Sequence, residues 1–132
     1  MKKLLTLFLT LFLIVTNAYA EWTFYSKSEE GIEFMYDKSS VKRNGDKVKV
    51  WIYYNTNEVS NNKETGTKIT RSWRSLNEID CVNDTTKILS LHIFEKPNLK
   101  GEPVDLTVPN PKITYISPGS TNSILIKLAC KK

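Results

Sequence analysis

The stretch NGDKVKVWIYY, residues 44–54, decides the fold of this chain. Asn44-Gly45 is the strongest hairpin-turn signal in the sequence, because both residue types tolerate the positive φ of a type I′ turn. The eight residues that follow the turn alternate, with one face made of Val48, Val50, Ile52 and Tyr54 and the other of Lys47, Lys49, Trp51 and Tyr53. This period of two predicts a β-strand that is buried on one face.

More strands are predicted on both sides of this segment. Alternating or β-rich patterns occur at residues 22–26, 33–36, 67–80, 85–95 and 104–108, and loops are predicted at residues 55–66 and 97–103. Residues 81–84 join two long strands as a second hairpin. At residues 37–40 we expect a local helical turn, because Asp and Ser side chains bond nearby backbone amides.

The period of the sequence changes near its end. Ser120 is suited to cap a helix, and residues at positions 121, 124, 125, 128 and 129 then recur at helical spacing. A strand over residues 124–128 competes with this interpretation, but we favour the helix. The predicted fold class is therefore α+β: a single small domain with an antiparallel sheet packed against a C-terminal α-helix and held by one disulfide.

The first twenty residues are predicted to be a cleaved export signal. Lys2 and Lys3 precede an apolar run at residues 4–15, and Ala18-Tyr19-Ala20 supplies the small residues that signal peptidase requires. The run is shorter than the roughly 20 residues of a membrane-spanning helix, which makes an uncleaved anchor the weaker alternative. Glu21 stands where a lipoprotein would carry a cysteine. We expect a domain of residues 21–132, exported by the Sec pathway, periplasmic or secreted, with no lipid or other stable membrane anchor.

Net charge and cysteine content indicate which kinds of partner the chain can bind and what role its two cysteines have. Cleavage after residue 20 removes two of the 19 basic residues and none of the 14 acidic ones, so the net charge falls from +5 to +3. The basic residues are spread along the chain, unlike the concentrated stripe of a nucleic-acid-binding protein, so no nucleic-acid partner is expected. In an oxidising compartment, Cys81 and Cys130 predict a structural disulfide. The alternative, a reactive or metal-binding thiol pair, lacks CxxC spacing.

No catalytic, metal-binding or cofactor-binding residues are predicted, and we expect no enzyme. The single histidine, His92, lies in a predicted strand between apolar neighbours, which is typical of a packing residue rather than a catalytic base. The sequence has no Gly-rich phosphate loop. A cell-wall hydrolase stays as an alternative only if two of four early carboxylates converge in a cleft. These carboxylates belong to Glu29, Glu30, Glu33 and Asp37.

A candidate binding surface consists of Trp51, Tyr53, Arg71, Trp73 and Arg74. Trp51 and Tyr53 share a predicted strand face with two lysines, and the other three residues lie on a predicted partner strand. Trp, Tyr and Arg are enriched at the energetic centres of protein interfaces, so an exposed patch of them would bind a polymer, a peptide or a protein. The interpretation we favour is that Trp51 and Trp73 pack beneath the C-terminal helix, with lysine side chains extending around them.

Several short motifs follow one another in a specific order. A Trp lies just after the signal, followed by YDKSSVKRNG at residues 36–45, VKVW at 48–51, EIDC at 78–81, Gly101 before Val104, and ISPGS at 116–120 before the last cysteine. This order resembles the surface-adhesin protein E family of Gram-negative bacteria over essentially the whole mature chain. The resemblance implies an antiparallel sheet packed on a C-terminal helix, and a bridge between Cys81 and Cys130.

The resemblance also implies a function. The founding member of the family is an outer-membrane adhesin that binds host extracellular-matrix and serum proteins and can dimerise. We therefore expect an exported, non-enzymatic binding protein with a protein partner, acting through its sheet face and the loop at residues 55–66, with a homodimer among its expected states. The alternative is a soluble periplasmic inhibitor or envelope-maintenance factor that binds an endogenous enzyme or a cell-wall component.

Overall fold

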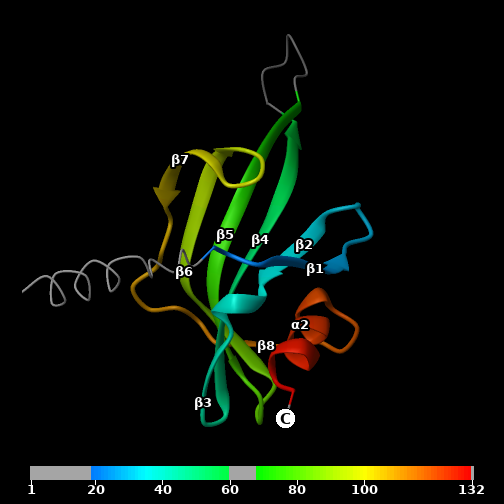
Figure 1. The fold of residues 1–132 in the computed structure, drawn as a ribbon, viewed down its shortest axis with the longest axis vertical. Coiled ribbons are helices and arrows are strands. Elements are labelled where there is room, and N and C mark those ends of the chain that lie inside the picture. Colours follow the sequence, from blue (N-terminus) through cyan, green and yellow to red (C-terminus); the bar gives the residue numbers. More distant parts are fainter. Residues whose placement is uncertain (1–18, 60–67, 132) are drawn as a thin grey trace, which may run out of the picture.

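The structure is a computed structural model and describes residues 19–59 and 68–131 (Figure 1). Most of the predicted export signal therefore lies outside the described residues. The strands are β1 (Trp22–Lys27), β2 (Glu33–Asp37), β3 (Lys42–Asn44), β4 (Lys47–Val59), β5 (Lys68–Asp80), β6 (Thr85–Lys96), β7 (Lys100–Asp105) and β8 (Thr114–Tyr115). The described helices are the 3-10 helix η2 (Lys38–Ser40) and the α-helix α2 (Thr121–Ala129).

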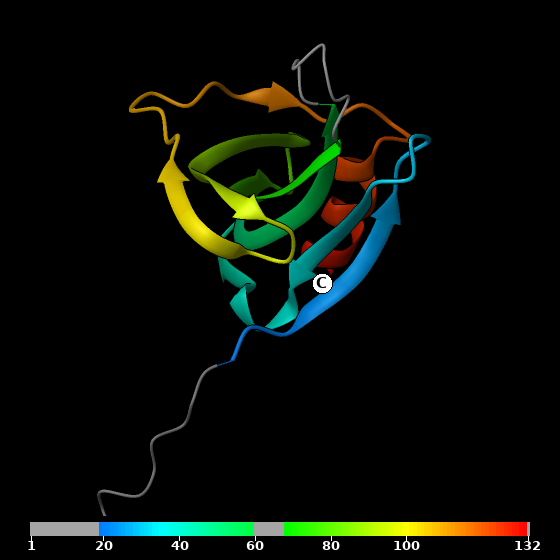
Figure 2. The same cartoon turned by 90° about the horizontal axis from the view of Figure 1, so that it is seen from above.

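All the strands pair in one antiparallel sheet of order β1-β2-β4-β5-β6-β7, to which β3 adds beside β4 and β8 beside β6. Seen from above, the sheet curls rather than lying flat (Figure 2). Its centre is the long hairpin of β4 and β5, which pair from Lys47↔Asp80 to Val59↔Lys68 without a register shift. The prediction of a small antiparallel sheet with one C-terminal helix is confirmed, although the domain is mostly sheet.

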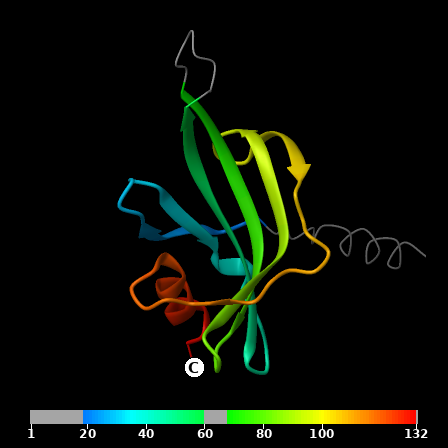
Figure 3. The same cartoon turned by 180° about the vertical axis from the view of Figure 1, so that it is seen from behind.

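The core lies between α2 and one face of β4 and β5. Val48 and Val50 are completely buried, as the alternation in residues 47–54 predicted, and Leu125 of α2 is 2 % exposed. Figure 3 shows α2 and the segment that connects β7 to α2 on the same face of the sheet. We call this the helix face. Its burial is the dominant favourable term in folding a domain of this size.

Helix α2 begins where the sequence predicted it. The Ser120 side chain accepts a hydrogen bond from the backbone N–H of Ser123 at 3.3 Å, and Thr121–Ala129 follows as helix. The competing strand over residues 124–128 is therefore excluded. Likewise Asp37 caps η2 by accepting from the N–H of Ser39, as the pattern at residues 37–40 indicated.

The disulfide between Cys81 and Cys130 is formed, with an S–S distance of 2.04 Å. It joins the turn between β5 and β6 to the C-terminal end of α2. The backbone N–H of Cys81 also donates to the carbonyl of Asp46 in the turn between β3 and β4. The bridge therefore holds the helix and two hairpin turns together at one end of the sheet.

Three predicted boundaries are wrong. Residues 55–59, predicted as the start of a loop, continue β4 because each has a partner in β5; the rest of that predicted loop, up to residue 66, lies outside the described residues. Pairing with a neighbouring strand overrides the low strand propensity of Asn. In the first hairpin, Asn44 is the last residue of β3, and only Gly45 (φ +61°) in the two-residue loop has positive φ.

The third boundary concerns β7, which spans Lys100–Asp105 instead of residues 104–108 and includes Pro103. In the described chain β7 pairs only with β6, and Pro103 lies opposite Phe94. A proline is tolerated on an edge strand because the missing N–H can face away from the ladder. The predicted strand therefore begins four residues too late, because Pro103 lies inside β7 rather than before it.

Candidate binding surface

The register between β4 and β5 divides the five predicted residues between the two faces of the sheet. Residues directly opposite each other in an antiparallel pair share a face. Arg74 lies opposite Tyr53, so it joins Trp51 and Tyr53 on the face away from α2. Trp73 lies opposite Tyr54 on the helix face, and Arg71 lies two residues away on that same face. The five residues therefore do not form one surface.

Trp51 does not pack beneath α2, which corrects the interpretation that we favoured. The helix contacts the face of β4 that carries Val48, Val50 and Ile52, and Trp51 points to the opposite side. The period of two in a strand makes this unavoidable once the valines are buried. We call the face that carries Trp51, Tyr53 and Arg74 the aromatic–arginine face.

Arg74 lies between two rings on the aromatic–arginine face. Its guanidinium carbon is 5.1 Å from the centre of the Trp51 ring and 5.2 Å from that of Phe94, which is 6 % exposed. Both distances are within cation–π range. Its Nε is buried and has no hydrogen-bond partner among the described residues. The two rings, one from β4 and one from β6, therefore fix a positively charged group in the middle of the sheet.

Aromatic and apolar side chains extend this face across β1 and β2. Trp22 meets Tyr53 edge-on, with ring centres 4.7 Å apart. Met35 lies opposite Tyr53 and also opposite Phe24, whose side chain is 51 % exposed. Sequence reasoning missed these three residues and Phe94. The sequence pattern indicated where the strands lie, but it did not indicate which strands pair with one another.

A polar row continues the aromatic–arginine face on its other side. His92 lies opposite both Arg74 and Asp105. The His92 Nε2 is 4.0 Å from the Asp105 carboxylate, and its Nδ1 is 3.4 Å from the Ser90 hydroxyl. Neither distance matches the 2.6–3.2 Å of a catalytic relay. Hydrogen bonds from Thr107 are the main reason why the pKa of Asp105 lies below its ordinary value.

Trp73 lies on the helix face instead, at the end of a row of aromatic rings. Its ring is parallel to that of Tyr54 at 6.5 Å, and Tyr54 meets Phe34 at 5.0 Å. Phe34 in turn packs on Tyr25. The indole N–H of Trp73 is buried without a hydrogen-bond partner in the described chain. Tyr25 belongs to the buried core cluster and Phe34 packs against it, so these two rings connect the row to the core.

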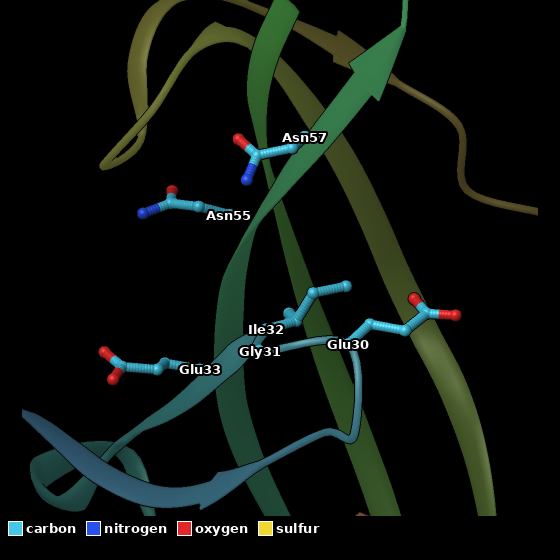
Figure 4. A pocket seen from close by; sticks show the side chains of 6 residues that line it. All are labelled: Glu30, Gly31, Ile32, Glu33, Asn55 and Asn57. Atoms are coloured by element: carbon cyan, nitrogen blue, oxygen red, sulfur yellow. The ribbon is translucent and has the colours of Figure 1, made fainter. Parts of the chain in front are cut away.

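Three of the four early carboxylates, those of Glu30, Glu33 and Asp37, do not converge. Glu30 and Glu33 line one cleft of about 290 Å³ with Gly31, Ile32, Asn55 and Asn57, but their side chains extend to opposite sides (Figure 4). Asp37 is buried and accepts hydrogen bonds from the backbone N–H of Glu21 and Ser39. The paired arrangement that a hydrolase needs is therefore not formed by these residues.

Two further features bear on the kind of protein this is. Among the described residues, no group of three or more His, Cys, Asp or Glu side chains is placed to hold a metal ion. Within the same ranges, no helix has both the length and the apolar character needed to span a bilayer.

Comparisons with known proteins agree on one family. The sequence profile described as Surface-adhesin protein E matches residues 22–131. Crystal form II of Haemophilus influenzae protein E superposes with a TM-score of 0.60 at 13 % identity, covering 80 % of this chain and 86 % of that one. Protein E from non-typeable Haemophilus influenzae gives a TM-score of 0.56 at 10 % identity, covering 89 % and 81 %. Identities this low establish a shared fold. No curated protein matches the sequence.

Proposed function

The chain belongs to the surface-adhesin protein E family, and on this premise we propose that it is an exported, non-enzymatic domain that binds proteins through its aromatic–arginine face. The observation that carries the proposal is the position of this face. Trp51, Tyr53 and Arg74 lie opposite the face that α2 covers, and Phe24 extends them with a half-exposed ring. Extracellular-matrix proteins are the proposed partners.

The chemistry of the face suits a protein partner. Trp, Tyr and Arg supply most of the binding energy in protein interfaces, and Arg contributes both a planar surface and hydrogen-bond donors. Arg74 is already held between two rings, so it has little conformational freedom left to lose on binding. The exposed Lys47 and Lys49 on the same side add a mild attraction for acidic surfaces.

A binding experiment with matched variants tests the proposal. Residues 21–132 would be immobilised and titrated with purified matrix proteins. The variants Phe24→Ala and Tyr53→Ala should weaken binding by about tenfold or more, because each removes an aromatic side chain of this face. Tyr115→Ala is the matched control, since Tyr115 is 80 % exposed and lies in β8, which pairs with β6 and not with the strands that carry Phe24 and Tyr53. Equal loss in the control, or no loss in the two face variants, would contradict the proposal.

The alternative function is favoured by Glu21, which replaces the cysteine of a lipid-anchored adhesin at the predicted cleavage site. In that case the same face binds an endogenous enzyme or a cell-wall component in the periplasm. Protease treatment of intact cells separates the two functions. A surface adhesin is degraded, whereas a periplasmic protein is protected until the outer membrane is opened. Light scattering of residues 21–132 then distinguishes a monomer from a homodimer.

A further inference from the structure

Strand β4 is longer than the strands on one of its sides. On the β5 side all thirteen residues have a partner. On the other side, β3 pairs with Lys47–Lys49 and β2 pairs with Ile52–Tyr54. From Asn55 onward, β4 has no strand on that side within residues 19–59 and 68–131. This part of β4 is therefore an open edge on the side of β2, while its other side is paired with β5.

Two hydrogen bonds show in which direction the main chain of this edge points. The N–H of Trp51 donates to the Ser40 hydroxyl at 3.0 Å, on the side of β2 and β3. The carbonyl of Asp46 accepts from Cys81 at 2.8 Å, on the side of β5. Main-chain groups alternate between the two sides of a strand, and β4 pairs with β5 without a register shift. The odd-numbered Asn55 and Asn57 therefore direct main-chain groups toward the open edge.

The open edge forms one wall of the cleft in Figure 4, and the turn at residues 30–33 forms the other. The edge side chains are held in place, because Asn55 exchanges hydrogen bonds with Asn98 and Asn57 accepts from Thr70. Glu33 extends to the same side as Asn55, and Glu30 extends to the other side. On a chain whose net charge is +5, this is a local pair of negative charges.

We propose that the open edge of β4 binds an extended segment of the partner by strand addition, and that this segment carries two adjacent basic residues. Main-chain hydrogen bonds to Asn55 and Asn57 would supply the pairing. Consecutive residues of an added strand point to opposite faces, so a Lys or Arg pair reaches Glu33 on one face and Glu30 on the other. The existing ion pair between Glu33 and Lys27 is exposed, spans 3.7 Å and is readily exchanged. The inference rests on the proposed protein-binding function and names the class of segment bound.

The probe is a synthetic peptide of about eight residues, rich in Thr and Val with two central lysines, titrated into ¹⁵N-labelled residues 21–132. The backbone amides of residues 55–59 should shift most. Asn57→Pro should weaken binding by about threefold to tenfold, because it removes an outward N–H. Proline is tolerated at such an edge position. Asn57→Thr is the matched control: it also removes the side-chain bond to Thr70 but keeps the N–H, and it should bind like the unmodified protein.

Three further arms make the result decisive. Two N-methylated peptides are compared on the unmodified protein, so this test does not depend on the folding of Asn57→Pro. Methylating the peptide nitrogens that face β4 should weaken binding, whereas methylating the alternate nitrogens, which face away from β4, should leave binding unchanged. Replacing the two lysines by glutamates, or Glu30 and Glu33 by glutamines, should also weaken binding. Shifts that map elsewhere, no binding at millimolar peptide, or equal affinity of Asn57→Pro and Asn57→Thr overturns the inference. If matrix proteins still bind and still need Phe24 and Tyr53, the proposed function stands without it.

Discussion

At the scale of single residues, Tyr25 carries one of the buried polar groups that lack a hydrogen-bond partner among the described residues. Its ring is 8 % exposed and packs on Phe34 and Tyr36, with centres 6.2 Å and 5.9 Å away. Its hydroxyl is buried without a hydrogen-bond partner among the described residues. Burial is the main reason why the pKa of Tyr25 lies well above the ordinary 10.0, and burial also raises the pKa of Tyr54.

Tyr25→Phe should therefore leave the free energy of unfolding at neutral pH unchanged or raise it by up to about 1 kcal/mol, because an unpaired buried hydroxyl is removed. A raised pKa in the folded state means that the unfolded chain ionises first. The stability that Tyr25 contributes is thus complete below the unfolded pKa of about 10 and falls as the pH rises above it.

Urea unfolding at pH 7 and at about pH 10.5 measures both effects. The unmodified protein should lose stability at the higher pH, and Tyr25→Phe should lose less. Tyr54→Phe should change the alkaline profile in the same direction but by a smaller amount. An alkaline loss that is equal in Tyr25→Phe and in the unmodified protein would show that folding does not raise the pKa of Tyr25.

At the scale of elements, α2 is a short helix whose stability depends on its start and on one buried face. Nine residues are too few for an isolated helix in water, so the helix needs both its cap and its packing. Leu125 and Ala129, one turn apart, are its buried residues, and they face the valines of β4. Ser120 supplies the cap at the first turn.

Ser120→Ala should lower the free energy of unfolding by about 1 kcal/mol, because the N–H of Ser123 loses its side-chain acceptor. Ser120→Asp keeps an acceptor and adds a negative charge at the positive end of the helix, so it should retain most of the stability. The midpoints of urea unfolding, followed by circular dichroism, give both values. Similar losses in the Ala and Asp variants would mean that the contact of Ser120 with the carbonyl of Ser117 matters more than the cap.

At the scale of the whole molecule, one covalent bond connects segments that are far apart in the sequence. Cys81 and Cys130 are separated by 49 residues, and their bridge encloses β6, β7, β8 and α2 in one loop. On the chain-entropy account, closing a loop of this length stabilises the folded state by about 4 kcal/mol. That is a large share of the roughly 5–15 kcal/mol that holds a typical domain together.

Reduction of the domain, or the double variant Cys81→Ala with Cys130→Ala, should therefore lower the midpoint of thermal unfolding strongly. Each single variant should behave like the double variant, because either one removes the bridge; the single variants would be studied with reductant present to prevent mixed disulfides. Differential scanning calorimetry provides the measurement. A midpoint unchanged by reduction would show that the packing of α2 on the sheet is sufficient without the bridge.

Much of the fold is local and could be predicted from the sequence. The alternation of residues 47–54 identified the buried face of β4, the Ser120 cap located α2, and the even pair of cysteines beside a predicted export signal predicted the disulfide. These features depend on period, on side-chain hydrogen bonding to nearby backbone and on redox environment, each of which acts over a few residues or on composition. The order of the motifs also indicated the family.

The candidate surface depended on the register between paired strands, which the sequence pattern of each strand does not specify. Which face Arg74 shares is set by its partner across the sheet, and a shift of one residue in that register would have placed it on the helix face, away from Trp51 and Tyr53. The same pairing extended β4 beyond the predicted loop boundary, and the smaller number of residues in β2 left the edge of Asn55 and Asn57 open. The sequence by itself determined which face of residues 47–54 is buried, where the C-terminal helix begins and where the chain is bridged. Only the tertiary structure decided which aromatic and charged groups share a surface, because strand register and neighbours are settled by long-range pairing.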